Sequence, residues 1–296
     1  MKKCMVIGAA MLDIVVKMER LPRSGEDMYM DSQEMTVGGC AYNVADILKH
    51  FEVPYTLFAP IGTGVYADII EKELAKNGHE SLIRAAQDNG YCMCIVEADG
   101  ERTFLTLPGV ECRFEKHWFE LLNPDEYDSV YVCGYEIEGE GGENIIEFLE
   151  QHPELTVYYA PGPRITYISQ EKHDRIMSLH PVLHLNDKEA LDFTRKDTIE
   201  DAAKELYEKN QNKVIVTLGS RGVYLQGKEG TLIPTQKVNA IDTIGAGDSH
   251  IGAIIAMRQK GAGFEEAIAT ANKVSGLVVG VQGPTLTTEE FHKGGF

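Results

Sequence analysis

The stretch Asp242-Thr243-Ile244-Gly245-Ala246-Gly247-Asp248 places a glycine-rich turn, a helix start and a carboxylate together. Residues 238–241 before it are predicted to form a short strand, and apolar residues recur at helical spacing from Ile251 onward. Gly245 and Gly247 can adopt backbone angles that other residues resist, which leaves N–H groups free at the helix N-terminus. Such a turn attracts phosphate, because unsatisfied donors and the positive end of the helix dipole coincide there.

Asp248 lies in the first turn of this predicted helix, where a negative charge is favoured and the carboxylate is expected to be ionised at neutral pH. It could accept a proton from an attacking hydroxyl group while the amides of residues 245–247 stabilise charge on a moving phosphoryl group. The alternative is a helix capped by a glycine turn and an acidic residue, since caps of this chemistry are common.

A second motif supports the first interpretation. Gly38-Gly39-Cys40-Ala41-Tyr42-Asn43 also opens a predicted helix, with apolar residues at helical spacing after it. The two motifs, in this order, resemble the signatures of the ribokinase-like carbohydrate kinases, also called the PfkB family. The resemblance covers nearly the whole chain.

The order of predicted elements is typical of an α/β fold, because apolar strand-like runs alternate with helical patterns. We therefore predict a three-layer α/β/α sandwich with a mostly parallel central sheet, in which ligands bind at the carboxyl ends of the strands. The clearest predicted strands are 55–61, 130–133, 155–160, 182–185 and 214–218, and the clearest helices are 67–76, 143–151, 171–178 and 199–209.

Two segments interrupt this alternation, at about residues 14–37 and 91–107. The second is predicted to be a hairpin with Asp99-Gly100 as its turn. The resemblance implies that both segments form a small β-sheet lid over the sugar, inserted in a single ribokinase-like domain of residues 1–296, and that the lid can serve as a homodimer contact. The alternative is an edge hairpin of the main sheet.

The resemblance implies an ATP-dependent kinase acting on a hydroxyl group of a small sugar or polyol, with Mg²⁺ and, in some members, K⁺. Asp248 would be the general base, with Gly245, Ala246 and Gly247 as the anion hole. The sugar would be bound by Asp13, Gly38, Gly39, Asn43 and Glu136. Glu136 begins an acid-rich stretch that could instead simply be solvated.

The nucleotide would contact Asn186, Thr217, Gly219, Ser220, Gly222 and Asn272 in such a kinase. No P-loop motif is present, so the turn at residues 245–247 is the main predicted phosphate site. By resemblance Glu189 would hold Mg²⁺ through water, and Asp242 and Ile244 would contribute to a K⁺ site. Asn186 could equally be a helix cap. Arg164 follows Ala160 where relatives have an aspartate, and we assign it no role.

Three other functions are compatible with parts of the sequence. A nucleoside kinase of the same family would place an aromatic side chain, from Tyr42, Tyr91 or Phe104, against a base. The turn at residues 62–67 fits the Gly-x-Gly-x-x-Ala form of an NAD-dependent oxidoreductase, with Asp88 at about the spacing of the ribose-binding acid. A non-catalytic sugar-binding protein would bind without turnover.

Composition excludes some partners. The chain has 296 residues, with 46 acidic against 28 basic side chains and a formal charge of −18. Nucleic acid and anionic membranes both require a basic surface, so neither is expected as a partner. No run approaches the roughly 18 consecutive apolar residues of a membrane-spanning helix. Together with six cysteines that lack disulfide or metal-site spacing, this predicts a soluble cytoplasmic protein.

Overall fold

The computed structural model describes residues 1–296 and is built on an eight-stranded β-sheet with the strand order β12-β11-β10-β9-β8-β7-β1-β4. Six of these strands are parallel, and β11 and β12 complete one edge in antiparallel fashion. Parallel strands require crossover helices, which cover both faces of the sheet. The strands are β1 (Lys3–Ile7), β4 (Tyr55–Phe58), β7 (Tyr127–Cys133), β8 (Thr156–Ala160), β9 (Val182–Asn186), β10 (Val214–Thr217), β11 (Val223–Gln226) and β12 (Gly230–Ile233).

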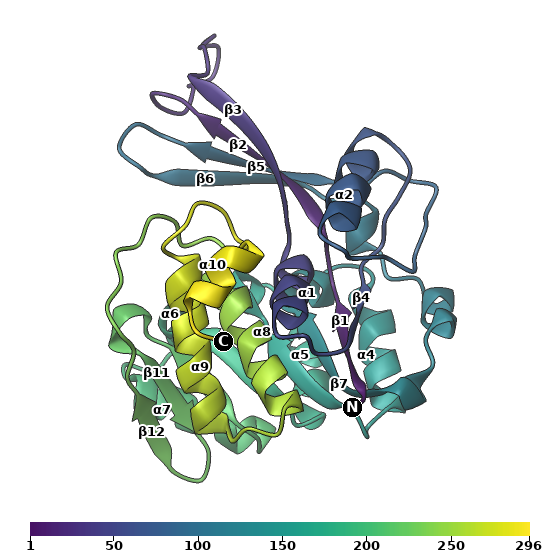
Figure 1. Ribbon diagram of the computed structural model, residues 1–296, viewed down its shortest axis with the longest axis vertical. Helices are drawn as coiled ribbons and strands as arrows, with labels where there is room; N and C mark the ends of the chain where they lie inside the picture. Colours follow the sequence, from purple (N-terminus) through teal and green to yellow (C-terminus); the bar gives the residue numbers. More distant parts are fainter.

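Helices pack on both faces of this sheet (Figure 1), and a separate hydrophobic cluster lies between the sheet and the helices on each face. Alternate strand residues supply the two clusters: Val6 belongs to one, Met5 and Ile7 to the other. One cluster is completed by α1 (Cys40–His50), α2 (Val65–Lys76), α8 (Ala246–Gln259), α9 (Phe264–Val278) and α10 (Thr288–Lys293). The other is completed by α3 (Gly134–Glu138), α4 (Gly142–Gln151), α5 (Gln170–Ser178), α6 (Asp187–Thr194) and α7 (Ile199–Asn210). The predicted three-layer sandwich is confirmed. None of these helices is long and apolar enough to cross a bilayer.

A second sheet of four strands, in the order β3-β2-β5-β6, projects beyond the larger one (Figure 1). We call it the lid sheet; it comprises β2 (Met11–Lys17), β3 (Ser32–Gly38), β5 (Tyr91–Val96) and β6 (Arg102–Leu107). The two predicted insertions thus pair with each other, and the alternative of an edge hairpin on the main sheet is wrong. Because β2 follows β1 after three residues, the chain passes directly from the main sheet into the lid sheet.

The strand expected at residues 238–241 is absent. These residues lie in an exposed segment without regular structure between β12 and α8. The N–H group of Ile241 donates to the carbonyl of Val279, just after α9, rather than to a strand. The side chains of Val238 and Ile241 are half or more exposed, so they are not core positions of a strand, and the glycine-rich motif follows a loop. The strand predicted at residues 55–61 ends at Phe58.

Candidate active site

The glycine-rich turn forms the N-terminus of α8. Gly245 is the N-cap residue with φ 74°, a left-handed conformation that favours glycine. A Cβ atom at this position would lie 2.7 Å from the Pro284 carbonyl oxygen, so a side chain would not fit. The N–H groups of Gly247 and Asp248 have no hydrogen-bond partner within the protein. Two free donors at the positive end of a 14-residue helix form an anion-binding turn, as the sequence predicts.

Asp248 connects the two sequence motifs. Asn43 in α1 donates from Nδ2 to Asp248 Oδ2 over 2.8 Å, and α1 packs directly against α8. Burial raises the pKa of the Asp248 carboxyl, and the hydrogen bond from Asn43 partly opposes this rise. The predicted sugar contact of Asn43 stays a prediction; in the structure its amide group is bonded to the predicted base.

A cavity of about 240 Å³ opens beside Asp248 at the carboxyl ends of β7, β8, β9 and β10. We call it the transfer cavity. Its wall includes the last residue of each of these four strands together with Glu189 and the glycine turn. Burial raises the pKa of Glu189, and the nearby Asp248 charge adds to this effect. The lining residues are Cys40, Tyr131, Cys133, Tyr135, Ala160, Gly162, Pro163, His184, Asn186, Glu189, Thr217, Gly245, Gly247 and Asp248.

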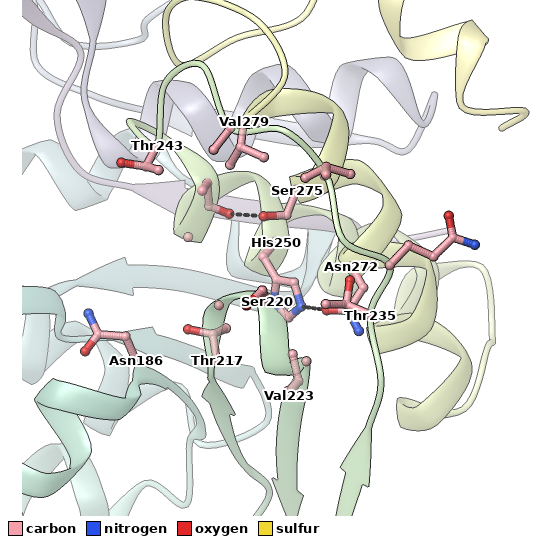
Figure 2. A pocket seen from close by; sticks show the side chains of 18 of the residues that line it. Asn186, Thr217, Ser220, Val223, Thr235, Thr243, His250, Asn272, Ser275 and Val279 are labelled. Carbon is pink, nitrogen blue, oxygen red and sulfur yellow. Dashed lines mark hydrogen bonds between the residues drawn. The ribbon is translucent and has the colours of Figure 1, made fainter.

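Figure 2 shows the residues that line a second cavity of about 380 Å³, which we call the nucleotide cavity. Asn186, Thr217 and Gly247 line both cavities. All six residues predicted to contact a nucleotide lie in its wall: Asn186, Thr217, Gly219, Ser220, Gly222 and Asn272. Gly219 and Gly222 have φ angles of 57° and 99°, which shape the turn after β10. The sequence motifs therefore converge on one continuous space.

Asn186 and Glu189 form a reciprocal capping box at the start of α6. The Glu189 N–H donates to Asn186 Oδ1 over 2.8 Å, and Glu189 Oε2 accepts from the Asn186 N–H over 2.9 Å. The two predicted roles of Asn186 are thus compatible, since the residue caps a helix and also lines both cavities.

Asp13 lies in β2, where the lid sheet leaves the main sheet. Its carboxylate packs on Gly38, at which a Cβ atom would lie 2.3 Å from Asp13 Oδ2. Burial raises the pKa of the Asp13 carboxyl to about 6. Gly38 also faces Pro284, the residue that packs on Gly245. Asp13 and the first glycine motif therefore lie near the anion-binding turn, on the lid side.

Glu136 lies in α3 and is buried, so the alternative of a solvated loop residue is wrong. Its Oε1 accepts from the Ala9 N–H over 3.0 Å, and its Oε2 accepts from the Cys133 thiol over 2.6 Å. Burial raises the pKa of this carboxyl to about 7. Glu136 does not line either cavity, and its hydrogen bonds tie the end of β1 to the end of β7.

Asp242, predicted to contribute to a K⁺ site with Ile244, has a cationic partner from the lid sheet. Arg102 in β6 donates to Asp242 Oδ1 over 3.2 Å. The N–H groups of Ile244 and Gly283 also donate to this carboxylate. Burial alone would raise the pKa of Asp242, but these donors hold it below its usual value. The lid sheet is thereby linked to the first residue of the glycine-rich motif.

Arg164 lines neither cavity. It forms an ion pair with Glu138 and lies over the ring of Tyr167, with its guanidinium carbon 4.2 Å from the ring centre. These contacts fix the loop after β8.

The turn at residues 62–67 does not bind a dinucleotide. Asp88 occupies the N-terminus of α2, where its carboxylate accepts from the N–H groups of Ala67 over 2.9 Å and Tyr66 over 3.4 Å. A pyrophosphate would require these same donors. Asp88 is therefore a helix cap, and the oxidoreductase prediction is wrong.

Three residues of the site were missed by sequence reasoning. His184 and His250 are buried and hydrogen-bonded to each other, and Cys40 lines the transfer cavity. Cys40 belongs to the first glycine motif, but a thiol there resembles an ordinary small apolar residue. No spacing rule connects His184 on a strand with His250 on a distant helix.

The chain belongs to the pfkB family of carbohydrate kinases, whose family model matches residues 1–290. It is therefore an enzyme that transfers a phosphoryl group to a sugar hydroxyl, and the predicted family and fold are confirmed.

Individual relatives agree with this assignment. The chain is 36% identical over 285 residues to the uncharacterised sugar kinase YegV of Escherichia coli, covering 94% of this chain and 89% of the relative. It is 26% identical over 297 residues to the ribokinase of Bacillus subtilis, with 98% of each chain covered. The crystal structure of Thermotoga maritima ribokinase superimposes with a TM-score of 0.86 at 26% identity, covering 99% of both chains. The protein is a sugar kinase of the ribokinase type.

Proposed function

We propose that this enzyme transfers the γ-phosphoryl group of ATP to a hydroxyl group of a small uncharged sugar or polyol. One observation carries the proposal: Asp248 and the two free N–H groups of Gly247 and Asp248 share one helical turn at the junction of two adjoining cavities. A nucleotide in the larger cavity would direct its terminal phosphate toward this turn, beside the carboxylate that could receive a proton.

In the proposed reaction Asp248 takes the hydroxyl proton as the sugar oxygen forms a bond to the γ-phosphorus atom. The bond from that phosphorus to the β-bridging oxygen breaks, and ADP leaves. The free N–H groups of α8 stabilise the charge on the transferring group. Asn43 keeps the Asp248 carboxylate oriented toward the cavity and favours its ionised form.

The residues of both cavities fit a requirement for Mg²⁺. No lysine or arginine lines either cavity, so the protein itself supplies no side-chain cation to the nucleotide phosphates. Glu189 opens into the transfer cavity and would hold the hydrated ion, since Mg²⁺ retains several waters and needs few carboxylates. When bound, Mg²⁺ supplies charge neutralisation to the phosphates. The K⁺ site at Asp242 and Ile244 remains a prediction, and the Arg102 ion pair already neutralises this carboxylate.

The acceptor side supports a small uncharged acceptor. Asp13 offers a carboxylate acceptor for hydroxyl groups, and the transfer cavity has no cation to bind a phosphosugar. Of the three aromatic residues that could contact a nucleoside base, Tyr42 is buried and hydrogen-bonded to Asn77. Tyr91 packs on Tyr66.

The strand register shows which lid residues share the Asp13 face. Asp13 pairs with Cys92, and Cys94, two residues further along β5, pairs with Phe104. Because side chains alternate along a strand, Phe104 lies on the Asp13 face and Tyr91 on the opposite one. Phe104 is therefore the remaining candidate for contact with a base or with the apolar face of a sugar ring.

The lid sheet also supports a homodimer. Three large apolar side chains on the face of the lid sheet opposite Asp13 are about half exposed: Met35, Leu105 and Leu107. Exposed apolar side chains gathered on one sheet are typical of an interaction surface. Sedimentation equilibrium should give twice the chain mass, and Leu105→Asp should lower it to one chain mass. A wild-type monomer would contradict the dimer.

The deciding experiment for function is an ADP-release screen over pentoses, hexoses, polyols and nucleosides, with Asp248→Asn as the blank. We expect turnover with at least one sugar or polyol. Activity restricted to nucleosides would overturn the sugar assignment. Sugar binding without ADP release, measured by calorimetry, would instead indicate a non-catalytic binding protein.

A further inference from the structure

A chain of three hydrogen-bonded side chains connects the two cavities. His184 Nε2 lies 2.9 Å from His250 Nδ1, and His250 Nε2 lies 3.2 Å from Asn272 Oδ1. His184, at one end, lines the transfer cavity, and His250 and Asn272 line the nucleotide cavity (Figure 2). Both imidazoles are nearly inaccessible, with exposed fractions of 5% and 2%.

The direction of each hydrogen bond in this series of three side chains follows from the Asn272 end. Asn272 Nδ2 lies 3.3 Å from the Pro234 carbonyl oxygen, which can only accept, so the amide nitrogen must face Pro234. Asn272 Oδ1 therefore faces His250 and accepts from a proton on Nε2. A neutral imidazole with its proton on Nε2 has a lone pair on Nδ1, so His184 must donate from its own Nε2.

Both imidazoles are neutral, because neither has a carboxylate partner. Burial lowers the pKa of His250 to about 4, and burial together with the neighbouring ring holds the pKa of His184 well below its usual value. When both imidazoles are neutral and the Pro234 carbonyl oxygen fixes the Asn272 amide, donation can run in only one direction, from His184 to His250 to Asn272. Turning the Asn272 amide over would set two carbonyl oxygens together and two N–H groups together.

We propose that His184 and His250 are positioning residues that hold the Asn272 amide with its second N–H available to an acceptor atom on the nucleotide base or ribose. The inference rests on the proposed function, because it assumes that a nucleotide occupies the larger cavity. It adds a selection rule: the nucleotide atom that meets Asn272 is a hydrogen-bond acceptor.

Two substitutions at one position test the proposal. His250→Phe keeps a flat ring but removes both hydrogen bonds, whereas His250→Gln retains one donor and one acceptor. We expect His250→Phe to weaken ADP binding about tenfold, the equivalent of one lost hydrogen bond, when measured by calorimetry. The KM for ATP should rise in parallel, with the KM for the acceptor unchanged. His250→Gln should stay within about threefold of wild type in ADP affinity.

His173 supplies a matched control. It is buried to the same 2% exposure and hydrogen-bonded to the Ile165 carbonyl, but it lines neither cavity. His173→Phe should leave ADP affinity unchanged even if it lowers the melting temperature. Equal losses of ADP affinity in His173→Phe and His250→Phe, or in the Phe and Gln variants at position 250, would reduce the histidine pair to a structural role and overturn the proposal.

A measurement on the wild-type protein complements these variants. Long-range ¹H–¹⁵N correlation spectra at pH 7 should show both rings neutral with the proton on Nε2. A proton on Nδ1 of His250, or a charged ring, would overturn the proposal even if a variant fails to fold. If wild-type protein binds ADP and phosphorylates a sugar while His250→Phe keeps full ADP affinity, only this inference fails. If wild-type protein does not bind ADP, the proposed function fails with it.

Discussion

Asp248 is a carboxylate whose reactivity depends on two opposing influences at the level of single atoms. Burial favours its protonated form, whereas the N–H donor of Asn43 favours its ionised form. The position at the start of α8 adds the positive end of the helix dipole. A base with a raised pKa accepts a proton more readily than an exposed aspartate, provided that it is still ionised at the working pH.

Asp248→Asn should lower kcat by about 10²- to 10⁴-fold, the usual contribution of a general base. The isosteric amide keeps the helix N-terminus intact, so ADP affinity measured by calorimetry should change little. A variant that retains more than about a tenth of wild-type turnover would show that Asp248 is not the base.

Asp13 should make acceptor binding depend on pH. Its pKa is raised to about 6, so the carboxylate is ionised above this pH and becomes protonated as the pH falls through it. A protonated carboxyl loses acceptor capacity for sugar hydroxyls, so the KM for the acceptor should rise below pH 6.

The measurement is kcat/KM for the acceptor as a function of pH, compared between wild type and Asp13→Asn. The variant should have a high KM that no longer changes near pH 6. An identical acid limb in both proteins would assign the titration to another group.

At the level of elements, the loops that follow the strands set the chemistry. The last residues of β7, β8, β9 and β10 all line the transfer cavity, because parallel strands bring their carboxyl ends to one edge. The helices α6 and α8 then begin at this edge and present their N-termini to it. Capping and ligand binding use the same backbone donors, so one residue can serve both.

Asn186→Ala should affect both helix capping and nucleotide binding. Loss of the cap on α6 should cost about 1 kcal/mol of unfolding free energy, and loss of a cavity residue should also raise the KM for ATP. Thr287→Ala is the matched control, since Thr287 forms an equivalent capping box with Glu290 on α10, outside both cavities. Denaturant titrations should give similar stability losses, and only Asn186→Ala should alter ATP kinetics. An unchanged KM would leave Asn186 with the capping role alone.

The ion pair between Arg102 in β6 and Asp242 should affect the acceptor more than stability. Its side chains are 33% and 13% exposed, and such pairs contribute about 0–1 kcal/mol. Arg102→Met should therefore change the melting temperature little. It should raise the acceptor KM several-fold at low salt, because the lid sheet loses its link to the glycine-rich motif.

The difference between Arg102→Met and wild type should shrink at high salt, where the charges are screened. Arg175→Met removes surface ion pairs to Glu143 and Glu150, away from the lid sheet, and should leave the acceptor KM unchanged. Equal effects of the two substitutions would indicate a general loss of stability instead.

At the level of the whole molecule, the negative charge of the protein creates a need for cations when a nucleotide binds. The chain carries a formal charge of −18, and neither cavity has a lysine or arginine in its wall. A nucleoside triphosphate is itself highly anionic, so its binding needs cations that the protein does not provide.

Removing divalent ions with a chelator should lower activity by about 100-fold or more, and added Mg²⁺ should restore it. Glu189→Gln should raise the Mg²⁺ concentration needed for half-maximal rate, with Glu171→Gln, in the first turn of α5, as the surface control. Full activity in the presence of chelator would contradict the requirement for Mg²⁺.

The sequence by itself determined the fold class, the family and the identity of the two glycine turns. These features are local: strand and helix periodicity, the left-handed conformation required of Gly245, and the residue types of a helix N-terminus can all be recognised within a few positions. Five of the six predicted nucleotide contacts lie at or just after the ends of β9 and β10, which share an edge, and Asn272 in α9 lines the same cavity. The strand predicted at residues 238–241 was wrong, since Val238 and Ile241 are exposed and the segment has no regular structure.

Only the tertiary structure decided which side chains face one another. It joined Asn43 to Asp248 and Arg102 to Asp242, assigned Asp88 to the cap of α2, and buried Glu136 between β1 and β7. It also paired His184 with His250 across the sheet and a helix. These contacts join residues far apart in the chain. Their geometry depends on how helices and strands pack, and a sequence pattern gives no distances between packed elements.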